Sequence, residues 1–411
     1  MKGCQVATLG PREQLGRFER RIWKPSPNVV GGRQARKGGP YHAFVPAPIA
    51  DRSFALDDDA VSAIASATKA LSRLDSSQPR FSSLSALATS LLRSESAASS
   101  RIEDLAISQK RLARATFKRP SGPGDRAIEV LGNVEAMIRA IDLGASATTI
   151  SPADIGEIHR TLLRFSVDRK VAGSFRDTQG WIGGNDYNPI GAAYVPPPPE
   201  HVVPLVEDLC QFIRRDDIAA VVQAAIAHAQ FENIHPFPDG NGRVGRALIY
   251  VILRRRGEAS NYIPPISLVL AAEQRSYFGG FGSFSRGDVS AWCELFAAAV
   301  ERAAWEAERI AARIEDRQAQ WLKRLGNPRR DAVVRTILSA LPEQPVTDVA
   351  AAQALTGRSH VSVQNALRQL EDAGILRRLN ERKWGRVWEC DELLELVEDF
   401  EEGVSTPQGV A

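Results

Sequence analysis

The sequence predicts a mainly α-helical chain of two or three domains, with one small β-hairpin and a pair of short strands near the C-terminus. Apolar residues recur at the spacing of a buried helix face in most of the chain. The clearest repeats lie at residues 59–74, 125–142, 218–229 and 290–325. Segments that read as strands are few and short. A chain of 411 residues exceeds one typical hydrophobic core, so we expect more than one domain.

The overall composition is that of an ordinary soluble protein. Hydrophobic residues make up 44% of the chain and charged residues 25%, which excludes a disordered chain. The net charge of +3 is too small to indicate a nucleic-acid or membrane partner by itself. The cysteines are scattered without metal or redox spacing, and we find neither a long apolar run nor an N-terminal hydrophobic signal region. We therefore expect a cytoplasmic protein that does not contact the membrane.

Residues 1–40 are expected to form a basic, flexible tail. They contain nine Lys or Arg residues against two Glu residues, glycine is frequent, and no period is sustained. Such a composition usually indicates a solvated tail, or residues that precede the true start codon. A nucleic-acid-binding arm is the less frequent alternative.

Residues 41–118 are expected to form an N-terminal helical region. Helical patterns predict two helices, over residues 59–74 and 84–92. A serine-rich stretch follows at residues 94–104. A Pro- and Gly-rich linker at residues 117–124 then separates this region from the next.

Residues 119–325 are expected to form the central domain. A helix over residues 125–142 is followed by one that begins after Ser151, where a Ser-Pro pair supplies an N-cap and a first-turn proline, and in which His159 is expected to pack. Residues 173–199 break the helical pattern, and two short strands around a Gly-, Asn- and Asp-rich turn predict a β-hairpin there. A long helix over residues 290–325 ends the domain.

The most informative segment is the polar loop at residues 234–246, which lies between two apolar helices. Three of its residues can adopt turn conformations that direct successive N–H groups at one point, namely Gly240, Asn241 and Gly242. This forms an anion-binding nest at a helix N-terminus. Arg243 and Arg246 lie in the first turn of that helix, where each cation costs roughly 0.3–1 kcal/mol through the helix dipole. The arrangement is favourable if an external polyanion neutralises both arginines.

Two further residues of the loop suit a nucleotide site. Asp239 supplies the hard oxygen ligand that would hold Mg²⁺ against phosphate oxygens. His235, held by Pro236, has an ordinary pKa of about 6.5 and can accept a hydroxyl proton near neutral pH. The residues themselves therefore indicate a Mg²⁺–nucleotide site with a histidine base, suited to phosphoryl or nucleotidyl transfer to a hydroxyl. Taken singly, each could instead belong to a well-packed loop, with His235 a core histidine.

The loop closely resembles the signature of the Fic family, His-Pro-Phe-x-Asp/Glu-Gly-Asn-Gly-Arg-x-x-Arg, and matches every fixed position. The resemblance implies an all-helical Fic core and an ATP-dependent protein adenylyltransferase, which transfers AMP to a side-chain hydroxyl and releases pyrophosphate. It implies that His235 is the general base and that Asp239 binds Mg²⁺. It assigns the outer phosphates to Arg243 and Arg246, and the anion hole to the three nest residues, Gly240, Asn241 and Gly242.

The serine-rich stretch resembles the inhibitory motif Ser/Thr-x-x-x-Glu-Gly/Asn, which lies N-terminal to the core in one class of Fic proteins. Ser99 and Glu103 match this motif, whereas Asp104 stands where the family usually has Gly or Asn. If a helix brings Glu103 to Arg246, the carboxylate neutralises a cation that ATP would otherwise engage, and the enzyme is autoinhibited. The alternative is an exposed Glu103 that pairs with Arg101 or water.

The predicted hairpin corresponds to the flap of Fic proteins, which holds the backbone of the target by strand addition. Its strands are expected at residues 181–182 and 193–195. The residues assigned to target docking are Trp181, Ile182, Gly183, Gly184 and Tyr194. A purely structural hairpin is the alternative.

Residues 264–282 resemble the end of the Fic core, the part of the family fold that completes the nucleoside pocket. Tyr277 would contact the adenine or, equally, pack as a buried aromatic. A Gly-rich loop is predicted directly after it, at residues 279–282.

Residues 328–411 resemble a winged helix-turn-helix domain, whose third helix usually reads the major groove of DNA. The expected elements are three helices and then two strands, at residues 331–341, 346–357, 359–373, 374–376 and 387–389. This region contains ten Lys or Arg and fourteen Asp or Glu residues, with acids clustered after Asp391. Because the acids oppose DNA binding, a docking or dimerisation module is favoured over a DNA-binding one.

Two functional classes are compatible with these observations. The leading one is a self-inhibited adenylyltransferase whose partners are ATP and a protein with an exposed Tyr, Thr or Ser hydroxyl; self-modification and a homodimer are left open. The other is a DNA-binding regulator with a vestigial nucleotide site. Such a site would be expected to lose His235, Asp239 or an arginine, and none is lost. A Fic enzyme that removes AMP or transfers another phosphate-containing group is a third option.

Overall fold

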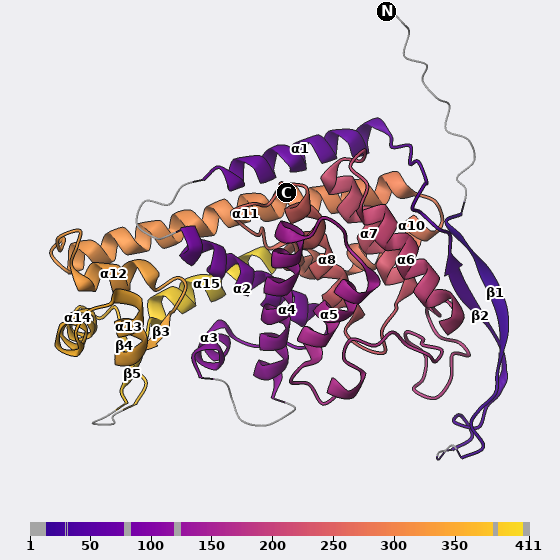
Figure 1. Cartoon of the computed structure of the whole chain (residues 1–411), viewed down its shortest axis with the longest axis horizontal. Helices are drawn as coiled ribbons and strands as arrows, with labels where there is room; N and C mark the ends of the chain where they lie inside the picture. Colours follow the sequence, from indigo (N-terminus) through magenta and orange to yellow (C-terminus); the bar gives the residue numbers. More distant parts are fainter. Residues whose placement is uncertain are drawn as a thin grey trace, which may run out of the picture.

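The centre of the molecule is formed by two buried helices, α7 and α8, that meet at the loop over residues 234–246 (Figure 1). The computed structural model describes residues 14–28, 30, 32–77, 84–118, 125–380 and 385–405. The helices of the central domain are α4 (Arg126–Ser146), α5 (Pro152–Leu163), α6 (Val202–Ile213), α7 (Ala220–Ile234), α8 (Asn241–Arg255), α9 (Ile266–Ala272), α10 (Gln274–Ser285) and α11 (Val289–Arg324). The mainly helical class predicted from the sequence is confirmed.

Close packing around α8 depends on small residues in its neighbours. A Cβ atom added to Gly144 of α4 would lie 2.6 Å from the carbonyl oxygen of Val251 in α8, so only glycine allows this approach. Helix α5 begins as expected: Ser151 and Asp154 form a reciprocal capping box, with proline in the first turn. The helices that flank the site loop are therefore held by tight packing and by a satisfied helix start.

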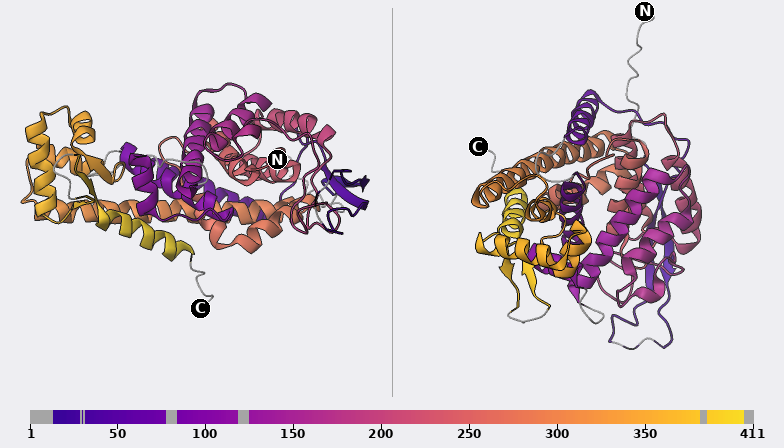
Figure 2. Two further views of the ribbon diagram at one scale, coloured as in Figure 1. Left: turned by 90° about the horizontal axis from the view of Figure 1, so that it is seen from below. Right: turned by 60° about the vertical axis from the view of Figure 1, so that its left-hand side comes forward.

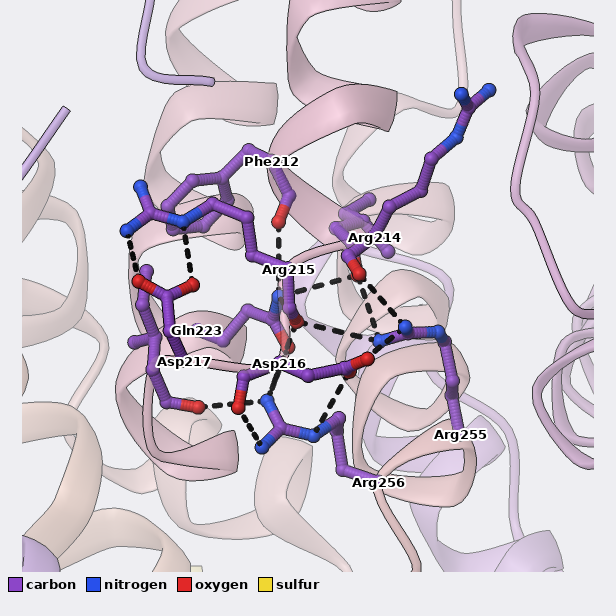
Figure 3. A network of polar contacts seen from close by, with 10 residues as sticks. Phe212, Arg214, Arg215, Asp216, Asp217, Gln223, Arg255 and Arg256 are labelled. Carbon is purple, nitrogen blue, oxygen red and sulfur yellow. Dashed lines mark hydrogen bonds and ion pairs between the residues drawn. The ribbon is translucent and has the colours of Figure 1, made fainter. Parts of the chain in front are cut away.

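The start of α7 is fixed by a polar network at the C-terminal end of α8 (Figure 3). Arg255 donates to the carbonyl oxygens of Ile213 and Arg214 at 3.0 and 2.8 Å. Arg256 donates to the carbonyl oxygen of Ile218 at 2.7 Å. These carbonyl groups belong to the end of α6 and the loop after it, where no helical partner is available. The arginines thus tie the α6–α7 connection to α8, at the end opposite the site loop.

Helix α1 (Asp58–Asp75) of the N-terminal region lies along the long helix α11 and packs on it (Figures 1 and 2). The region also contains α2 (Leu84–Ile102) and α3 (Gln109–Phe117). Helix α2 is longer than predicted and continues through most of the serine-rich stretch. Of the linker predicted at residues 117–124, positions 119–124 lie outside the described residues.

The expectation of a flexible tail over residues 1–40 is wrong at residues 16–23 and 39–40, which belong to strands. Strand β1 (Gly16–Trp23) pairs antiparallel with β2 (Gly39–Pro46). The many charged residues of β1 make its sequence look unlike a strand. In the structure, Arg21 on the half-buried face of β1 is paired with Glu200 of another segment at 2.5 Å. Charge composition cannot reveal that a distant carboxylate neutralises a strand residue. Positions 1–13 lie outside the described residues.

The C-terminal unit has the predicted order of helices and adds an unpredicted one. Its elements are α12 (Val333–Ala340), β3 (Val346–Asp348), α13 (Val349–Thr356), α14 (His360–Asp372), β4 (Arg377–Arg378), β5 (Val387–Glu389) and α15 (Asp391–Ser405). The three strands form an antiparallel sheet in the order β3–β5–β4. The acidic end of the chain thus forms a helix, α15, that returns toward the core (Figure 2). Assignment of the unit as a winged helix-turn-helix stays a prediction.

None of the helices in the described ranges combines the length and apolar character needed to cross a membrane.

Candidate active site

His235 lies at the C-terminal end of α7 in a left-handed conformation, with φ 49° and ψ 60°. This conformation is uncommon for a residue with a side chain and needs support from its surroundings. The support comes from Arg176, whose Nε donates to the carbonyl oxygen of His235 at 2.8 Å, and whose backbone N–H donates to the carbonyl oxygen of Pro236 at 2.9 Å. The side chain of Asn241 bonds both backbone groups of Phe237 at 2.8 Å and closes the loop. The histidine is therefore positioned by the scaffold.

A second histidine, His159 of α5, holds the middle of the loop. Its Nδ1 accepts from the N–H of Gly173 at 2.9 Å, so its Nε2 donates to the carbonyl oxygen of Asp239 at 3.0 Å. Burial lowers the pKa of His159 to about 4, which fits this neutral tautomer. Its ring stacks on Phe237 with centroids 3.8 Å apart. His159 was expected to pack within its helix, and its hydrogen bonds show that it also holds the loop in place.

Helix α8 begins directly at the predicted nest. Gly240 has φ 77°, a conformation that favours glycine, and the first helical hydrogen bond runs from Val244 N to Gly240 O at 3.1 Å. The amide groups of Asn241, Gly242 and Arg243 therefore precede the helical ladder, and none donates to an acceptor within the described part of the chain. This is an anion-binding arrangement at a helix N-terminus.

The two arginines of α8 differ in what they contact. Arg243 is 4% exposed and donates from NH2 to Asp239 Oδ2 at 3.1 Å. The side chain of Asp239 is 52% exposed, so its carboxylate is accessible from solvent. A single accessible carboxylate beside an amide nest suits Mg²⁺, which typically binds one or two carboxylates together with substrate phosphates.

Arg246 is buried and held by the N-terminal helix α2. It donates from Nε to Ser99 Oγ at 2.9 Å, and from NH2 to Ser99 O at 2.8 Å and Glu103 Oε1 at 2.9 Å. A Cβ atom added to Gly242 would collide with the same Glu103 carboxylate, which therefore lies against the nest. The contact between Glu103 and Arg246 considered from the sequence is present in the structure.

The departure from the inhibitory motif at Asp104 has a conformational explanation. Helix α2 ends at Ile102, and Asp104 has φ 60° in the turn that follows. Gly and Asn are favoured at such positions, and Asp is the next most tolerant residue. Asp104 therefore preserves the turn that places Glu103 beside Arg246.

The electrostatics of the site keep the candidate base neutral and Glu103 charged. Burial, together with the charge of Arg176, lowers the pKa of His235 to about 4, and its Nδ1 has no hydrogen-bond partner among the described residues. Burial alone would raise the pKa of Glu103, but the charge and hydrogen bond of Arg246 lower it below its ordinary value. At neutral pH the site thus combines an unprotonated imidazole with an ion-paired carboxylate.

The predicted hairpin is reduced to one antiparallel bridge between Ile182 and Tyr194. The two short strands expected there pair as predicted only at this bridge, and Gly183 and Gly184, with φ of 72° and 82°, begin the turn between them. Trp181 and Tyr194 anchor the segment: Trp181 packs on Trp23, and the Tyr194 hydroxyl donates to Asn233 O at 2.6 Å. Ile182 and both glycines are exposed and remain available for contact.

Tyr277 is 1% exposed, and its hydroxyl group and His228 Nε2 form a hydrogen bond of 2.8 Å. Contact between Tyr277 and adenine stays a prediction. The Gly-rich loop predicted after Tyr277 is wrong, since α10 continues through residues 279–282. Gly280 allows this helix to pack against Trp292, whose ring a Cβ atom would meet at 2.5 Å. Tyr277 therefore packs as a buried aromatic residue, as one of the two roles considered from the sequence requires.

Arg176 is the functional residue that the sequence reasoning missed. It is 5% exposed and, besides His235, donates to the carbonyl oxygens of Thr178, Ile234 and Pro197 at 3.1, 3.3 and 2.6 Å. It therefore joins both ends of the flap segment to the loop that carries the histidine. In the sequence, the role of Arg176 could have been inferred only from its position as a single arginine in the Gly-Ser-Phe-Arg segment before the predicted hairpin.

We expect Arg176→Leu to lower the free energy of unfolding by about 2–4 kcal/mol, because it leaves buried carbonyl groups without donors. Thermal denaturation measures this loss. Arg169→Leu, at an exposed position, serves as the control and should leave the melting temperature nearly unchanged. Equal melting temperatures for both variants would contradict the structural role assigned to Arg176.

Two parts of the chain match known family patterns. Residues 149–253 match the Fic/DOC family, and residues 61–142 match the Fic/DOC family N-terminal region. The protein adenylyltransferase fic-1 of Caenorhabditis elegans is 32% identical over 168 residues, which are 39% of this chain and 30% of the relative. The protein adenylyltransferase Fic of Culex quinquefasciatus is 29% identical over 249 residues, 57% of this chain and 46% of the relative. The chain thus spans less than half the length of these relatives.

A solved structure supports the same fold. The crystal structure of a Fic family protein from Desulfovibrio desulfuricans G20 covers 82% of this chain and 97% of its own, with 21% identity and a TM-score of 0.53. At 21% identity, this likeness shows only that the two proteins share a fold. The signature loop at the start of α8 lies within the segment that matches the Fic/DOC family, and the helices before it match the N-terminal region of that family.

Proposed function

We propose that the protein transfers AMP from ATP to the hydroxyl group of a protein side chain. The observation that carries the proposal is one loop that joins a neutral, positioned histidine to a nest of undonated backbone amide groups and two helix-borne arginines. In this reaction the hydroxyl oxygen bonds to the α-phosphorus, His235 accepts the hydroxyl proton, and the bond to pyrophosphate breaks. The curated relatives named protein adenylyltransferases support this reaction class.

The nucleotide would be bound through its phosphates. The free amide groups of Asn241 and Gly242 suit phosphate oxygens, and Arg243 and Arg246 supply positive charge beside them. Asp239 would hold Mg²⁺, which neutralises phosphate charge when bound. Contact between the buried Tyr277 and the nucleoside stays a prediction.

We expect Asp239→Asn to raise the Mg²⁺ concentration needed for half-maximal transfer by about tenfold or more, because a neutral amide oxygen replaces the anionic ligand. A Mg²⁺ titration of labelling at saturating ATP measures this change. Asp168→Asn, an exposed acid away from the loop, is the matched control. An unchanged Mg²⁺ requirement in Asp239→Asn would exclude Asp239 as the ligand.

The resting protein would be autoinhibited by Glu103. Its carboxylate occupies the guanidinium group of Arg246 and lies against Gly242, where phosphate oxygens would have to bind. A displaced triphosphate would misplace the α-phosphorus, and an error of about 1 Å can cost on the order of 10²-fold in rate. The inhibition is therefore a competition between one carboxylate and the outer phosphates.

The target would dock at the flap segment. Its bridge at Ile182 and Tyr194 and the exposed glycines beside it leave backbone groups near the surface for pairing with an extended chain. A Tyr, Thr or Ser hydroxyl on that chain would then face His235. The target is another protein or a second copy of this one.

A labelling experiment tests the proposal. Lysate is incubated with the Glu103→Gly variant, Mg²⁺ and ATP labelled at the α-phosphorus, and modified proteins are identified by the mass of one adenylyl group. Parallel incubation with ATP labelled at the γ-phosphorus separates AMP transfer from phosphorylation. Absence of α-label from every protein, with a folded variant that binds ATP, would overturn the proposal.

A further inference from the structure

The acidic C-terminal helix α15 packs against α3, α9 and α11, so it lies beside the segment that carries Glu103 (Figures 1 and 2). In the sequence, this stretch stands out only as a cluster of acids. In the structure its apolar residues, among them Phe400 and Val404, are buried against the core. The C-terminal unit is therefore attached to the core through this helix.

Glu401 of α15 contacts both sides of the turn that carries Glu103. One carboxylate oxygen accepts from Arg101 NH2 at 3.0 Å, and Arg101 lies two residues before Glu103. The other oxygen accepts from Gln109 Nε2 at 2.6 Å, at the start of α3. Glu401 is 4% exposed, so its contact with Gln109 is buried and its contact with the 32% exposed side chain of Arg101 is partly buried; both are charge-assisted. One side chain of the C-terminal helix thus clamps the end of α2 to the beginning of α3.

Further contacts keep α3 and the C-terminal unit together. Lys110 Nζ pairs with Glu395 at 2.8 Å, and its backbone N–H donates to Glu398 at 3.2 Å. Arg114 binds the buried Glu389 through two nitrogens, at 2.7 and 2.6 Å. At its far end α15 is held by Arg302, which donates to a backbone carbonyl at 3.0 Å. The acids of this unit are therefore partly neutralised by the core.

Backbone hydrogen bonds from Glu103, Asp104 and Leu105 to the last residues of α2 close the turn, so the turn is attached to the end of that helix. Glu103 lies beyond the end of α2 and retains 34% side-chain exposure, and the residue after it has positive φ. Its approach to Arg246 depends on the position of the α2 terminus, which Arg101 connects to Glu401. Loss of the clamp would let the turn move and expose Arg246 to a nucleotide.

We propose that α15 braces the inhibitory turn, so that a displacement of the C-terminal unit releases Glu103 from Arg246 and switches on AMP transfer. The C-terminal unit would then act as the regulatory domain of the Fic site. This inference rests on the proposed adenylyl transfer and adds the route by which that activity is controlled.

The test compares Glu401→Ala with Asp399→Ala, which removes the same charge from an exposed position on the same helix. Labelling from α-labelled ATP should rise about tenfold in Glu401→Ala, because weakening a charge-assisted contact shifts the turn toward its open state. Hydrogen exchange of a peptide covering residues 99–108 should accelerate in parallel. Asp399→Ala should match the wild type in both measurements.

The Glu103→Gly background shows whether the effect passes through the inhibitory acid. Adding Glu401→Ala to Glu103→Gly should change labelling by less than about twofold, because the inhibitor is already absent. Another tenfold rise in this double variant would overturn the proposed route. Equal labelling and exchange in Glu401→Ala and Asp399→Ala would overturn the brace itself.

Two controls separate the possible failures. If Glu401→Ala lowers the melting temperature by several degrees, Arg101→Gln removes the same ion pair from its more exposed side and should give the same rise. If Glu103→Gly shows no AMP transfer at all, the proposed function fails, whereas hydrogen exchange still decides whether Glu401 holds the turn.

Discussion

His235→Ala is expected to lower AMP transfer by about 10²–10⁴-fold, because general-base catalysis contributes on this scale. The assay should use the Glu103→Gly background, where inhibition does not mask the loss. ATP binding should stay within about twofold of the parent, since the nest amides and both arginines remain. Binding can be followed by calorimetry or by a fluorescent ATP analogue.

A matched control is available on the surface of the C-terminal unit. His360 is exposed, lies at the start of α14 and is remote from the loop, so His360→Ala should transfer AMP like the parent. Undiminished labelling by His235→Ala would show that His235 is not the base. Loss of both labelling and ATP binding would instead point to a disrupted loop, which thermal denaturation can detect.

The pH dependence of transfer follows from the same histidine. Burial and the charge of Arg176 lower the pKa of His235 to about 4, and the unprotonated form is the one that can accept a proton. Activity limited by this group is therefore present above the lowered pKa and is lost only as the pH falls through it. We expect kcat/KM to remain flat from pH 8 to about pH 5, whereas a histidine with its ordinary pKa would lose activity near pH 6.5.

Glu103→Gly is expected to raise AMP transfer by on the order of 10²-fold, the effect of correcting a misplaced reacting group by about 1 Å. Arg246 loses its carboxylate partner but keeps Ser99, so the guanidinium group stays near the nest and becomes available to phosphate. Initial rates of label incorporation from α-labelled ATP measure the change.

Asp104→Gly is the matched control for this variant. It removes the same charge from the next position and installs the residue that the φ of 60° favours, so the turn and the inhibition should persist. Equal or lower labelling in a folded Glu103→Gly variant would contradict autoinhibition. Activation by both variants would mean that negative charge near the turn, rather than the Arg246 contact, restrains the enzyme.

Acid should not activate the wild type in the mildly acidic range. Arg246 lowers the pKa of Glu103 below its ordinary value, so the ion pair is present above that pKa and is lost only as the pH falls through it. Measuring transfer between pH 5 and 8 on one preparation would thus show no activation toward the acidic end.

The local elements of this protein follow from local sequence rules. The capping box at Ser151 and Asp154, the apolar faces of α1 and α11, and the break at residues 234–246 each depend on a few neighbouring residues. Their conformations are set by short-range hydrogen bonds and by helical periodicity. For the same reason the loop that carries the candidate site can be located from its own residues and the two helices beside it.

Features that join distant segments were predicted poorly. The flexible-tail assignment failed at β1, because its Arg21 is paired with Glu200 and its backbone with β2. The loop predicted at residues 279–282 failed because the glycines there serve close packing on Trp292 within a helix. Arg176 and Glu401 carried no recognisable pattern, since their partners lie elsewhere in the chain.

The sequence by itself determined that a histidine, an amide nest and two arginines occur at one helix start. Only the tertiary structure decided that Glu103 reaches the second arginine, that Tyr277 is buried, and that Glu401 of the last helix contacts Arg101 near Glu103. The physical reason is that helices and caps arise from contacts between neighbours. The charge balance of a buried site, in contrast, depends on which remote side chains the fold brings within hydrogen-bonding distance.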